Sequence, residues 1–383
     1  MTFKMDQGIT CPVRVLQVIG SMNLGGAEAM IMNLYRKMDR EKVQFDFLLQ
    51  TYDESIYEKE IKNLGGRIFR INKFRGKDPK RYYKDCCKFF EEHPEIRVVH
   101  GHIGSSAALY LKAAKQYGCF TIAHSHSALK IRNPHDFLFY VWSYPTRYIA
   151  DQLFGCSTEA GIARYGKRVV SSEKYQNFNN GIDIDQFDFS EDRRRKIREE
   201  FKLKEELIIG TVGRLTLPKN PQKIFEIFKK TVQLDSNARC LWVGTGELEG
   251  KYHDLIRDEG LENRIIMTGP RTDVSDVLQA FDAFLFPSLW EGLPVSVIEA
   301  QATGLPCILS DTISREVDVS HLVEWMSIEE SNEAWADMCL EKARIAKTKG
   351  RTCPRQAIGD AGYDITKTSH WLQKFYIEKA SRG

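Results

Sequence analysis

The sequence predicts an α/β protein with two doubly wound domains, and three observations support this prediction. The chain has 383 residues, more than a single hydrophobic core usually fills. Short apolar runs rich in β-branched residues alternate with longer helical patterns, as in parallel sheets covered by helices. The first of these runs leads directly into a pair of glycines and then a helix, which is the order found in nucleotide-binding folds.

The first domain is expected at residues 1–187. Its first strand, 13–19, leads into Gly25 and Gly26 and then into a helix that continues to Tyr35. Four further apolar runs predict the remaining strands, at residues 43–49, 67–71, 98–102 and 120–124. We place the domain boundary here because residues 177–187 are rich in turn formers and a highly charged helix follows them.

A second series of strands and helices predicts another Rossmann-like domain at residues 188–362. Its strands are expected at residues 207–212, 238–243, 265–268, 283–286 and 307–309. The last segment, 363–383, reads as a helix in which Trp371, Leu372, Phe375 and Tyr376 are spaced for packing. We expect this helix to return to the first domain.

Composition excludes several classes of protein. Hydrophobic residues make up 42% and charged residues 28% of the chain, as in packed globular domains. The net charge of +3 provides no global electrostatic footprint for nucleic acid. The nine cysteines are scattered without paired ligand spacing, which favours reduced thiols in a cytoplasmic protein. Neither a signal peptide nor an apolar run of about 18 residues is present, so any membrane contact is expected to be peripheral.

The most informative stretch is 284–311, which reads as strand, loop, helix, turn and strand. Pro294 suits the first turn of the helix, which places Gly292 and Leu293 at its N-terminus. Backbone N–H groups and the dipole there favour a phosphate by up to about 2 kcal/mol. Glu291 precedes this end, and Glu299 lies about 7.5 Å along the axis beyond Pro294. One carboxylate can therefore meet a sugar and the other a ribose, with a diphosphate between them.

These residues resemble the family 4 retaining glycosyltransferases of GT-B fold, whose E-x7-E signature is present as Glu291 to Glu299. The resemblance extends in order through four other motifs, which are GGAE at 25–28, NGID at 180–183, GRLTLPKN at 213–220 and VGTGELEG at 243–250. It implies two Rossmann-like domains that face each other across a cleft. It also implies that Glu291 contacts the donor sugar and Glu299 the ribose.

The motif GRLTLPKN supplies the counter-charges that a diphosphate leaving group needs. Arg214 can bind phosphate oxygens bidentately, and Lys219 adds a mobile point charge. Gly244 ends a strand in a turn where the backbone approaches a nucleobase or ribose, although a purely structural turn explains it almost as well. By resemblance, the backbone at Arg271 lines the base pocket. No D-x-D motif lies where a metal-dependent transferase needs one, so we predict no required metal and no cofactor.

In the first domain, His124 and His126 follow a predicted strand at its carboxyl end, where open α/β sheets bind ligands. The family has a histidine near this position that contacts the donor sugar or acceptor. The spacing leaves both as candidates, with His126 slightly favoured and His102 as a third. Gly26 resembles the glycine of the family that lies beside the diphosphate.

The predicted activity is that of a retaining, metal-independent hexosyltransferase of exopolysaccharide or capsule biosynthesis. The donor is expected to be a UDP-sugar rather than a GDP-sugar, and the acceptor a saccharide or polyprenyl-linked saccharide. Since no nucleophilic carboxylate is identified, we favour same-face substitution assisted by the leaving phosphate. Residues 73–90 hold seven basic side chains interleaved with aromatics, and 135–148 is apolar and aromatic. Both suggest peripheral contact with the anionic inner face of the cell membrane, although the first also fits a solvated helix face and the second an acceptor cleft or a core helix.

Two other functions fit the same architecture. A nonhydrolysing nucleotide-sugar epimerase would form its product without an acceptor, and a noncatalytic sugar-nucleotide-binding protein would bind nucleotide without turnover. An oxidoreductase fits less well because the N-terminal glycines do not form G-x-G-x-x-G and no acidic residue is placed for an adenosine ribose.

Overall fold

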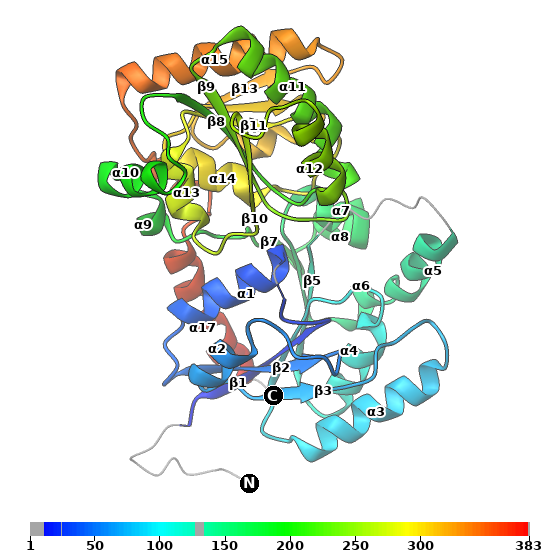
Figure 1. Ribbon diagram of the computed structural model, residues 1–383. Helices are drawn as coiled ribbons and strands as arrows, with labels where there is room; N and C mark the ends of the chain where they lie inside the picture. Colours follow the sequence, from blue (N-terminus) through cyan, green and yellow to red (C-terminus); the bar gives the residue numbers. More distant parts are fainter. Residues whose placement is uncertain (1–10, 24, 127–133, 382–383) are drawn as a thin grey trace. The chain divides into compact units, whose positions relative to one another are not determined.

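The computed structural model describes residues 11–23, 25–126 and 134–381 (Figure 1). Residues 1–10, which were searched above for a signal peptide, lie outside these ranges. The chain forms two compact units. The first comprises Met1–Gly181 together with Ile365–Gly383, and the second comprises Ile182–Asp364. The sequence boundaries were placed after residues 187 and 362, whereas Ile184 and Phe187 pack into the core of the second unit because both side chains are apolar and buried.

The first unit contains a seven-stranded parallel sheet with the order β3-β2-β1-β4-β5-β6-β7. The strands are β1 (Val13–Ile19), β2 (Val43–Leu49), β3 (Ile68–Arg70), β4 (Val98–Gly101), β5 (Phe120–Ser125), β6 (Gln152–Gly155) and β7 (Tyr175–Asn177). The helices are α1 (Gly26–Lys37), α2 (Glu58–Asn63), α3 (Pro79–Glu92), α4 (Ala107–Gln116), α5 (Pro134–Ser143), α6 (Thr146–Ile149), α7 (Thr158–Tyr165), α8 (Lys167–Val170) and α17 (Ile365–Ala380). This order is that of a doubly wound Rossmann-like fold.

The second unit repeats this topology in a six-stranded parallel sheet with the order β10-β9-β8-β11-β12-β13. The strands are β8 (Leu207–Val212), β9 (Ala238–Val243), β10 (Ile265–Gly269), β11 (Ala283–Phe286), β12 (Cys307–Ser310) and β13 (Val323–Met326). The helical segments are α9 (Ile184–Phe187), α10 (Glu191–Glu200), η1 (Leu217–Lys219), α11 (Pro221–Leu234), α12 (Glu249–Asp258), α13 (Val274–Ala280), α14 (Val295–Ala302), η2 (Arg315–Val317), α15 (Asn332–Lys349) and α16 (Arg355–Asp360). The prediction of two α/β domains is confirmed.

Each sheet is buried on both faces, because separate hydrophobic clusters lie on its two sides. In the first unit, one cluster joins β1 and β2 to α1 and α17, and the other joins the sheet to α3 and α4. Leu372 and Tyr376 of α17 are fully buried in the first of these clusters. The last helix of the chain therefore completes the core of the unit that the first strand begins.

Two long helices start where their sequences supply a cap. Asp78 accepts a hydrogen bond from the backbone N–H of Arg81 at 3.0 Å, and Pro79 opens α3. Asn220 likewise accepts from the N–H of Lys223 at 3.4 Å, with Pro221 as the first residue of α11. A side-chain acceptor satisfies one of the unpaired N–H groups of the first turn, and proline fits there because it has no N–H.

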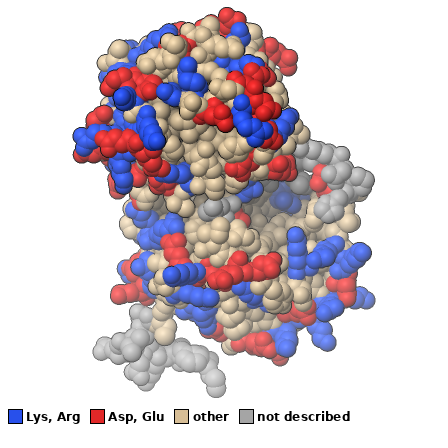
Figure 2. Space-filling view, viewed as in Figure 1, with Lys and Arg blue, Asp and Glu red and all other residues tan. Residues whose placement is uncertain are grey.

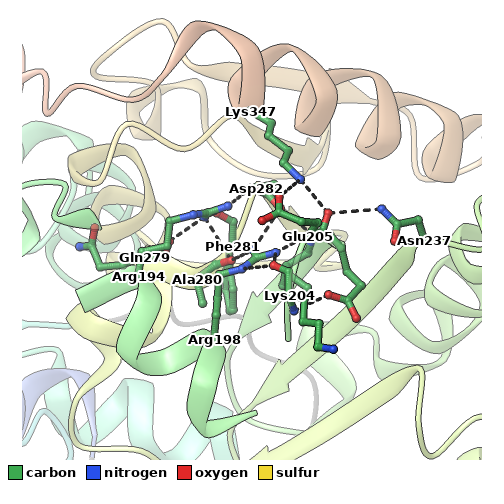
Figure 3. A network of polar contacts seen from close by, with 12 residues as sticks. Arg194, Arg198, Lys204, Glu205, Asn237, Gln279, Ala280, Phe281, Asp282 and Lys347 are labelled. Atoms are coloured by element: carbon green, nitrogen blue, oxygen red, sulfur yellow. Dashed lines mark hydrogen bonds and ion pairs between the residues drawn. The ribbon is translucent and has the colours of Figure 1, made fainter. Parts of the chain in front are cut away.

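A buried polar network ties α10 to the start of β11 in the second unit (Figure 3). The carboxylate of Asp282 accepts from Arg194 at 2.6 Å and from the backbone N–H of Ile208 at 2.8 Å. Arg198 lies 3.6 Å from the same carboxylate and donates to the carbonyl of Ala280 at 3.0 Å. Because the side chain of Asp282 is 3% exposed, this charge depends on its partners.

Two features of the described chain concern its surroundings. No helix among the described residues has the length and apolar character needed to cross a membrane. All nine cysteines lie within the described ranges, and each is a free thiol.

Candidate functional site

In the second unit, the loops that follow β8, β9 and β10 meet through their backbones. The N–H of Gly213 donates to the carbonyl of Val243 at 3.0 Å, and that of Gly244 donates to Gly269 at 3.0 Å. Gly244 has a φ of 135°, and a Cβ atom there would lie 2.0 Å from the carbonyl oxygen of Gly213. Only glycine fits this position, because its backbone packs directly against that of Gly213. This packing accounts for Gly244 as a structural turn, and its contact with a nucleobase or ribose stays a prediction.

Lys219 and Glu291, which were predicted separately, come together at the point where the strand order reverses. Lys219 follows β8 and Glu291 follows β11, the two strands on either side of this switch point. The Nζ atom of Lys219 lies 2.8 Å from Oε1 of Glu291 and 4.4 Å from the centre of the Phe286 ring. Ligands of open α/β sheets bind at this crevice.

The contact between Lys219 and Glu291 is an ion pair without a directed hydrogen bond. Although the charges are 2.8 Å apart, Oε1 of Glu291 has no hydrogen-bond donor in suitable geometry within the described chain. Both side chains are largely enclosed, with 20% and 14% of their surfaces exposed. A ligand with hydroxyl donors can therefore compete for the carboxylate, while the ammonium remains available for an anion.

Arg214 lies on the same edge and is exposed. It lines a small pocket with Lys219, where the other walls come from Thr211, Val212, Gly213, Ile224, Trp242 and Phe286. The two predicted cations are thus brought together, and one stays accessible to solvent.

The loop that carries Glu291 is held by the segment that carries Lys219. The N–H of Leu289 donates to the carbonyl of Pro218 at 2.8 Å, and the amide of Asn220 donates to the carbonyl of Pro287 at 3.2 Å. Pro294 is the residue before α14 rather than a residue of its first turn, a difference of one position at a helix end. Gly292 and Leu293 precede it, and the Leu293 side chain packs into the core, leaving its backbone for a ligand.

Glu299 lies on α14 with its carboxyl partly exposed but surrounded by enough protein that burial raises its pKa to about 7. Among the residues that the structure describes, the carboxyl has no hydrogen bond or ion pair. A carboxylate in this environment gains from hydroxyl donors such as those of a ribose, because they would offset the cost of its charge.

This environment predicts a pH dependence of stability. A carboxyl whose pKa is raised in the folded chain binds more protons when folded, so its stabilising effect is complete below 4.5 and is lost as pH rises through about 7. Relative to Glu299→Gln, we expect the wild-type free energy of unfolding to fall by about 2 kcal/mol across this range, after allowance for partial exposure. Urea unfolding of both chains at several pH values measures the difference. Glu341→Gln changes an exposed glutamate of α15 as the control, and parallel profiles for Glu299→Gln and wild type would contradict the prediction.

Arg271 follows β10, but its guanidinium is engaged by two carboxylates. It bonds Glu200 at 2.5 Å and Asp273 at 2.6 Å, and these hydrogen bonds raise its pKa. The backbone at this position therefore remains its predicted contribution to a base pocket.

The three predicted histidines lie in the first unit, where they form one cluster with His100. His100 and His102 come from the end of β4, and His124 and His126 from the end of β5. His100 Nε2 lies 3.2 Å from His124 Nδ1, and His102 Nδ1 lies 2.8 Å from His126 Nε2. Burial lowers the pKa of His100 to about 3 and that of His126 to about 4, and it lowers those of His102 and His124 well below the usual range. All four rings are therefore neutral near pH 7.

Ring nitrogens of His100, His102 and His124 lie within 4.8 Å of one another, a spacing that a metal ion can use. Both ring nitrogens of His100 and of His102 already have hydrogen-bond partners, so a metal would have to displace these bonds, whereas Nε2 of His124 has no partner within the described chain. The solvent exposure of the two candidate histidines differs. His124 is 4% exposed, whereas His126 is only partly buried.

Gly26 opens α1, and a Cβ atom there would meet nothing within 4 Å. Packing does not require glycine at this position, so its predicted role in close approach of a ligand is compatible with the structure. Nearby, a pocket of about 700 Å³ lies at the carboxyl ends of β1, β2 and β3. It is lined by Gly20, Ser21, Asn23, Gln50, Thr51, Tyr52, Asp53, Asn72, Lys73 and Arg75.

Sequence reasoning missed this pocket, although a signal was present. Gly20, Gln50 and Asn72 each lie one position beyond a predicted strand, and polar residues such as Gln50 and Asn72 there point to a ligand. It also missed Gln17, which is buried within β1 and accepts from His102 at 2.8 Å. The sign that the sequence offered for Gln17 was a single glutamine within an apolar strand.

Comparison with known proteins identifies the family. Residues 192–337 match the family described as Glycosyl transferases group 1. EpsF of Bacillus subtilis (strain 168), a provisionally named glycosyltransferase, is 32% identical over 371 residues, which is 95% of this chain and 96% of EpsF. The chain belongs to the group 1 glycosyltransferases.

Two further relatives and one solved structure are also similar to this chain. The UDP-Gal:alpha-D-GlcNAc-diphosphoundecaprenol alpha-1,3-galactosyltransferase of Escherichia coli is 30% identical over 52% of this chain and 53% of its own length. The capsular polysaccharide biosynthesis glycosyltransferase CapH of Staphylococcus aureus is 23% identical over 96% of this chain and 99% of its own. Anabaena HepE in complex with UDP and glucose has the same fold, with a TM-score of 0.76 at 16% identity over 94% of this chain and 98% of that one. The predicted GT-B fold is confirmed.

Proposed function

We propose that this glycosyltransferase moves a hexose from a UDP-sugar to a saccharide or lipid-linked saccharide acceptor in exopolysaccharide or capsule biosynthesis. The observation that carries the proposal is the pairing of Lys219 with Glu291 at the switch point of the second unit. A cation for a diphosphate and a carboxylate for sugar hydroxyls are thereby held side by side. The names of the Escherichia coli and Staphylococcus aureus relatives support the class of substrate and product.

The chemistry proposed for this site is dominated by electrostatics. Arg214 and Lys219 would stabilise the negative charge that develops on the departing diphosphate, which is commonly the largest catalytic term. Glu291 would bind the sugar hydroxyls, and Glu299 the ribose. Because two protein cations serve the diphosphate, we propose that no metal ion is required. The leaving phosphate would deprotonate the acceptor hydroxyl on the same face, and the anomeric configuration would be retained.

A thermal-shift screen of UDP, GDP and ADP, with and without EDTA, tests the donor site. A ligand that binds only the folded chain raises its stability by about 2.7 kcal/mol at a hundredfold excess over Kd. We expect selective stabilisation by UDP that persists in EDTA and is lost in Arg214→Ala. Selective stabilisation by GDP or ADP would overturn the choice of base, and loss of UDP binding in EDTA would overturn metal independence. NMR of the product would show an inverted anomeric centre if retention is wrong.

We further propose that the first unit contacts an anionic membrane through α5 and the segment around α3. All seven basic side chains of residues 73–90 are exposed, and Figure 2 shows Lys and Arg side chains, among acidic ones, in the region where Figure 1 places α3. The expectation that aromatics add to this surface was wrong for Phe74, Tyr82 and Phe90, which are buried in the core.

The apolar part of the surface comes from α5 instead. Phe137, Leu138 and Val141 are 56%, 46% and 49% exposed, so this stretch is not a core helix. Trp142 of α5 packs against Phe74, with ring centres 5.2 Å apart, and this contact joins the helix to the basic segment. Cations beside exposed apolar side chains fit the interface of an anionic bilayer.

Cosedimentation with liposomes tests this surface. We expect binding to vesicles that contain phosphatidylglycerol at low salt, with less binding to phosphatidylcholine alone. Phe137→Ser with Val141→Ser should weaken binding about thirtyfold or more, since each exposed apolar side chain contributes on the order of 1 kcal/mol or more. Equal binding to both kinds of vesicle, or no effect of the double substitution, would contradict the proposal.

A further inference from the structure

Two chains of hydrogen bonds run through the histidine cluster of the first unit. In one chain, Oε1 of Gln17 lies 2.8 Å from His102 Nε2, and His102 Nδ1 lies 2.8 Å from His126 Nε2. In the other, the hydroxyl of Tyr376 lies 2.6 Å from His100 Nδ1, and His100 Nε2 lies 3.2 Å from His124 Nδ1. Gln17 is 1% exposed, so its chain begins inside the sheet.

The orientation of the Gln17 amide determines where each proton of the first chain lies. With its oxygen facing His102, that oxygen only accepts, so His102 Nε2 carries a proton that it donates to Gln17. In this orientation the amide nitrogen of Gln17 has no hydrogen-bond partner within the described chain. Because burial keeps His102 neutral, its Nδ1 has no proton and accepts from His126. His126 then carries its single proton on Nε2. Its Nδ1 is left with a bare lone pair.

That lone pair is unsatisfied. Nδ1 of His126 is buried and has no hydrogen-bond partner within the described chain. A buried acceptor without a donor costs about 1 to 3 kcal/mol, so such an atom calls for an explanation. A hydroxyl group supplies the missing donor, whereas a carbonyl or carboxylate oxygen would be repelled.

The second chain ends differently. His124 Nε2 is also without a partner, but His124 is 4% exposed and lies deeper in the unit. His126 is only partly buried, at the carboxyl edge of the sheet where ligands bind. The geometry therefore favours His126 over His124 as the residue that meets a substrate.

We propose that Gln17 and His102 are positioning residues that hold His126 in the tautomer with a bare Nδ1, and that this atom accepts a hydrogen bond from a sugar hydroxyl. The second half of this proposal rests on the proposed glycosyltransferase function, and the first half does not. A rotated Gln17 amide would reverse the chain, because its N–H would donate to His102 and the proton of His126 would move to Nδ1. The two arrangements make opposite predictions for one atom.

Nitrogen-15 NMR of the folded full-length chain distinguishes them, because protonated and bare imidazole nitrogens resonate far apart. The His126 signals are assigned by their loss in His126→Gln. We expect a protonated Nε2 and a bare Nδ1. A protonated Nδ1, or an averaged pair of signals, would overturn the assignment. Addition of UDP-glucose should shift the Nδ1 signal and addition of UDP should not, since only the former brings a sugar.

Two substitutions of Gln17 test the positioning role. Gln17→Met has a similar length but no acceptor, so His126 should populate both tautomers and kcat/KM for the donor should fall about tenfold, as for one lost hydrogen bond. The donor KM should carry part of this loss, because the bound sugar already makes the hydrogen bond. Gln17→Glu places a carboxyl group against His102 that donates or transfers its proton to Nε2, so the proton of His126 should move to Nδ1 and kcat/KM should fall at least as far. A lower kcat/KM with an unchanged His126 spectrum in Gln17→Met, or a bare Nδ1 in Gln17→Glu, would refute the role.

Tyr110→Phe serves as the control for a general loss of stability. It removes a buried hydroxyl that donates to the carbonyl of Ile103 at 3.0 Å in the same unit. This variant should keep the wild-type tautomer and kcat. If Gln17→Met does not fold, Gln17→Glu and the wild-type spectrum still decide the tautomer. If the wild-type chain binds no nucleotide sugar, the proposed function fails, whereas a protonated Nδ1 refutes the positioning role alone.

Discussion

Lys219→Met lowers kcat/KM for the sugar donor by about a hundredfold to a thousandfold, which is the usual cost of removing one preorganised charge from a developing anion. The Lys219 ammonium lies 2.8 Å from Glu291 and 4.4 Å from the Phe286 ring, so its position is set before a substrate arrives. Methionine keeps the length and the apolar stem but not the charge. Most of the loss should appear in kcat, because the charge on the diphosphate grows as the bond to the sugar breaks.

Lys223→Met is the matched control for this experiment. Lys223 lies four positions further along, in the first turn of α11, and its ammonium donates to the carbonyl of Glu330 at 2.6 Å. Its removal should change kcat/KM by less than about threefold, as for a partly exposed contact away from the reacting atoms. Equal losses in both variants would show that Lys219 acts through the fold rather than on the leaving group.

Asp282→Ala destabilises the second unit by about 3 to 5 kcal/mol, the range observed when one partner of a buried ion pair is removed. Arg194 and Arg198 would remain with side chains only 12% and 9% exposed, and the N–H of Ile208 would lose its acceptor. Both arginines also bond carbonyls at the end of α13, so they cannot swing into solvent without breaking further contacts (Figure 3). Urea unfolding followed by tryptophan fluorescence measures the change.

An exposed ion pair in the same unit provides the comparison. Asp254 pairs with Arg257 on α12, and both side chains are about 60% exposed. Asp254→Ala should cost less than about 1 kcal/mol, since solvent screens such pairs. A loss for Asp282→Ala as small as that for Asp254→Ala would mean that water replaces the missing carboxylate.

The fold was predictable because buried parallel strands leave a strong pattern. β1, β2, β8, β9 and β11 have the same bounds in the structure as in the sequence prediction. The missed strands, β6, β7 and β13, are three or four residues long, and two of them lie at sheet edges. A short edge strand is covered on fewer sides, so its side chains need not be uniformly apolar, as in the sequence Tyr-Gln-Asn of β7.

The site was predictable only in part, for a different reason. Motifs indicate which side chains gather at the edge of a sheet, as they did for Lys219 and Glu291. Motifs do not show which ring nitrogen of a histidine already has a hydrogen-bond partner. His100, Gln17 and Tyr376 take part in these bonds, and they come from distant parts of the chain. The hydrogen bond between Arg271 and Glu200 could not be predicted from the sequence either, since 71 positions separate the two residues.

The return of α17 to the first unit limits the order in which the protein can be completed during synthesis. Ribosomes release the chain from its N-terminus, so β1 to β7 emerge before the second unit and α17 emerges after it. Until then, the apolar surface that Leu372 and Tyr376 cover stays open, and His100 lacks its hydroxyl partner. A polypeptide interrupted anywhere before α17 therefore carries an unfinished first unit, however much of the second it contains, and exposes an apolar surface to cellular quality control.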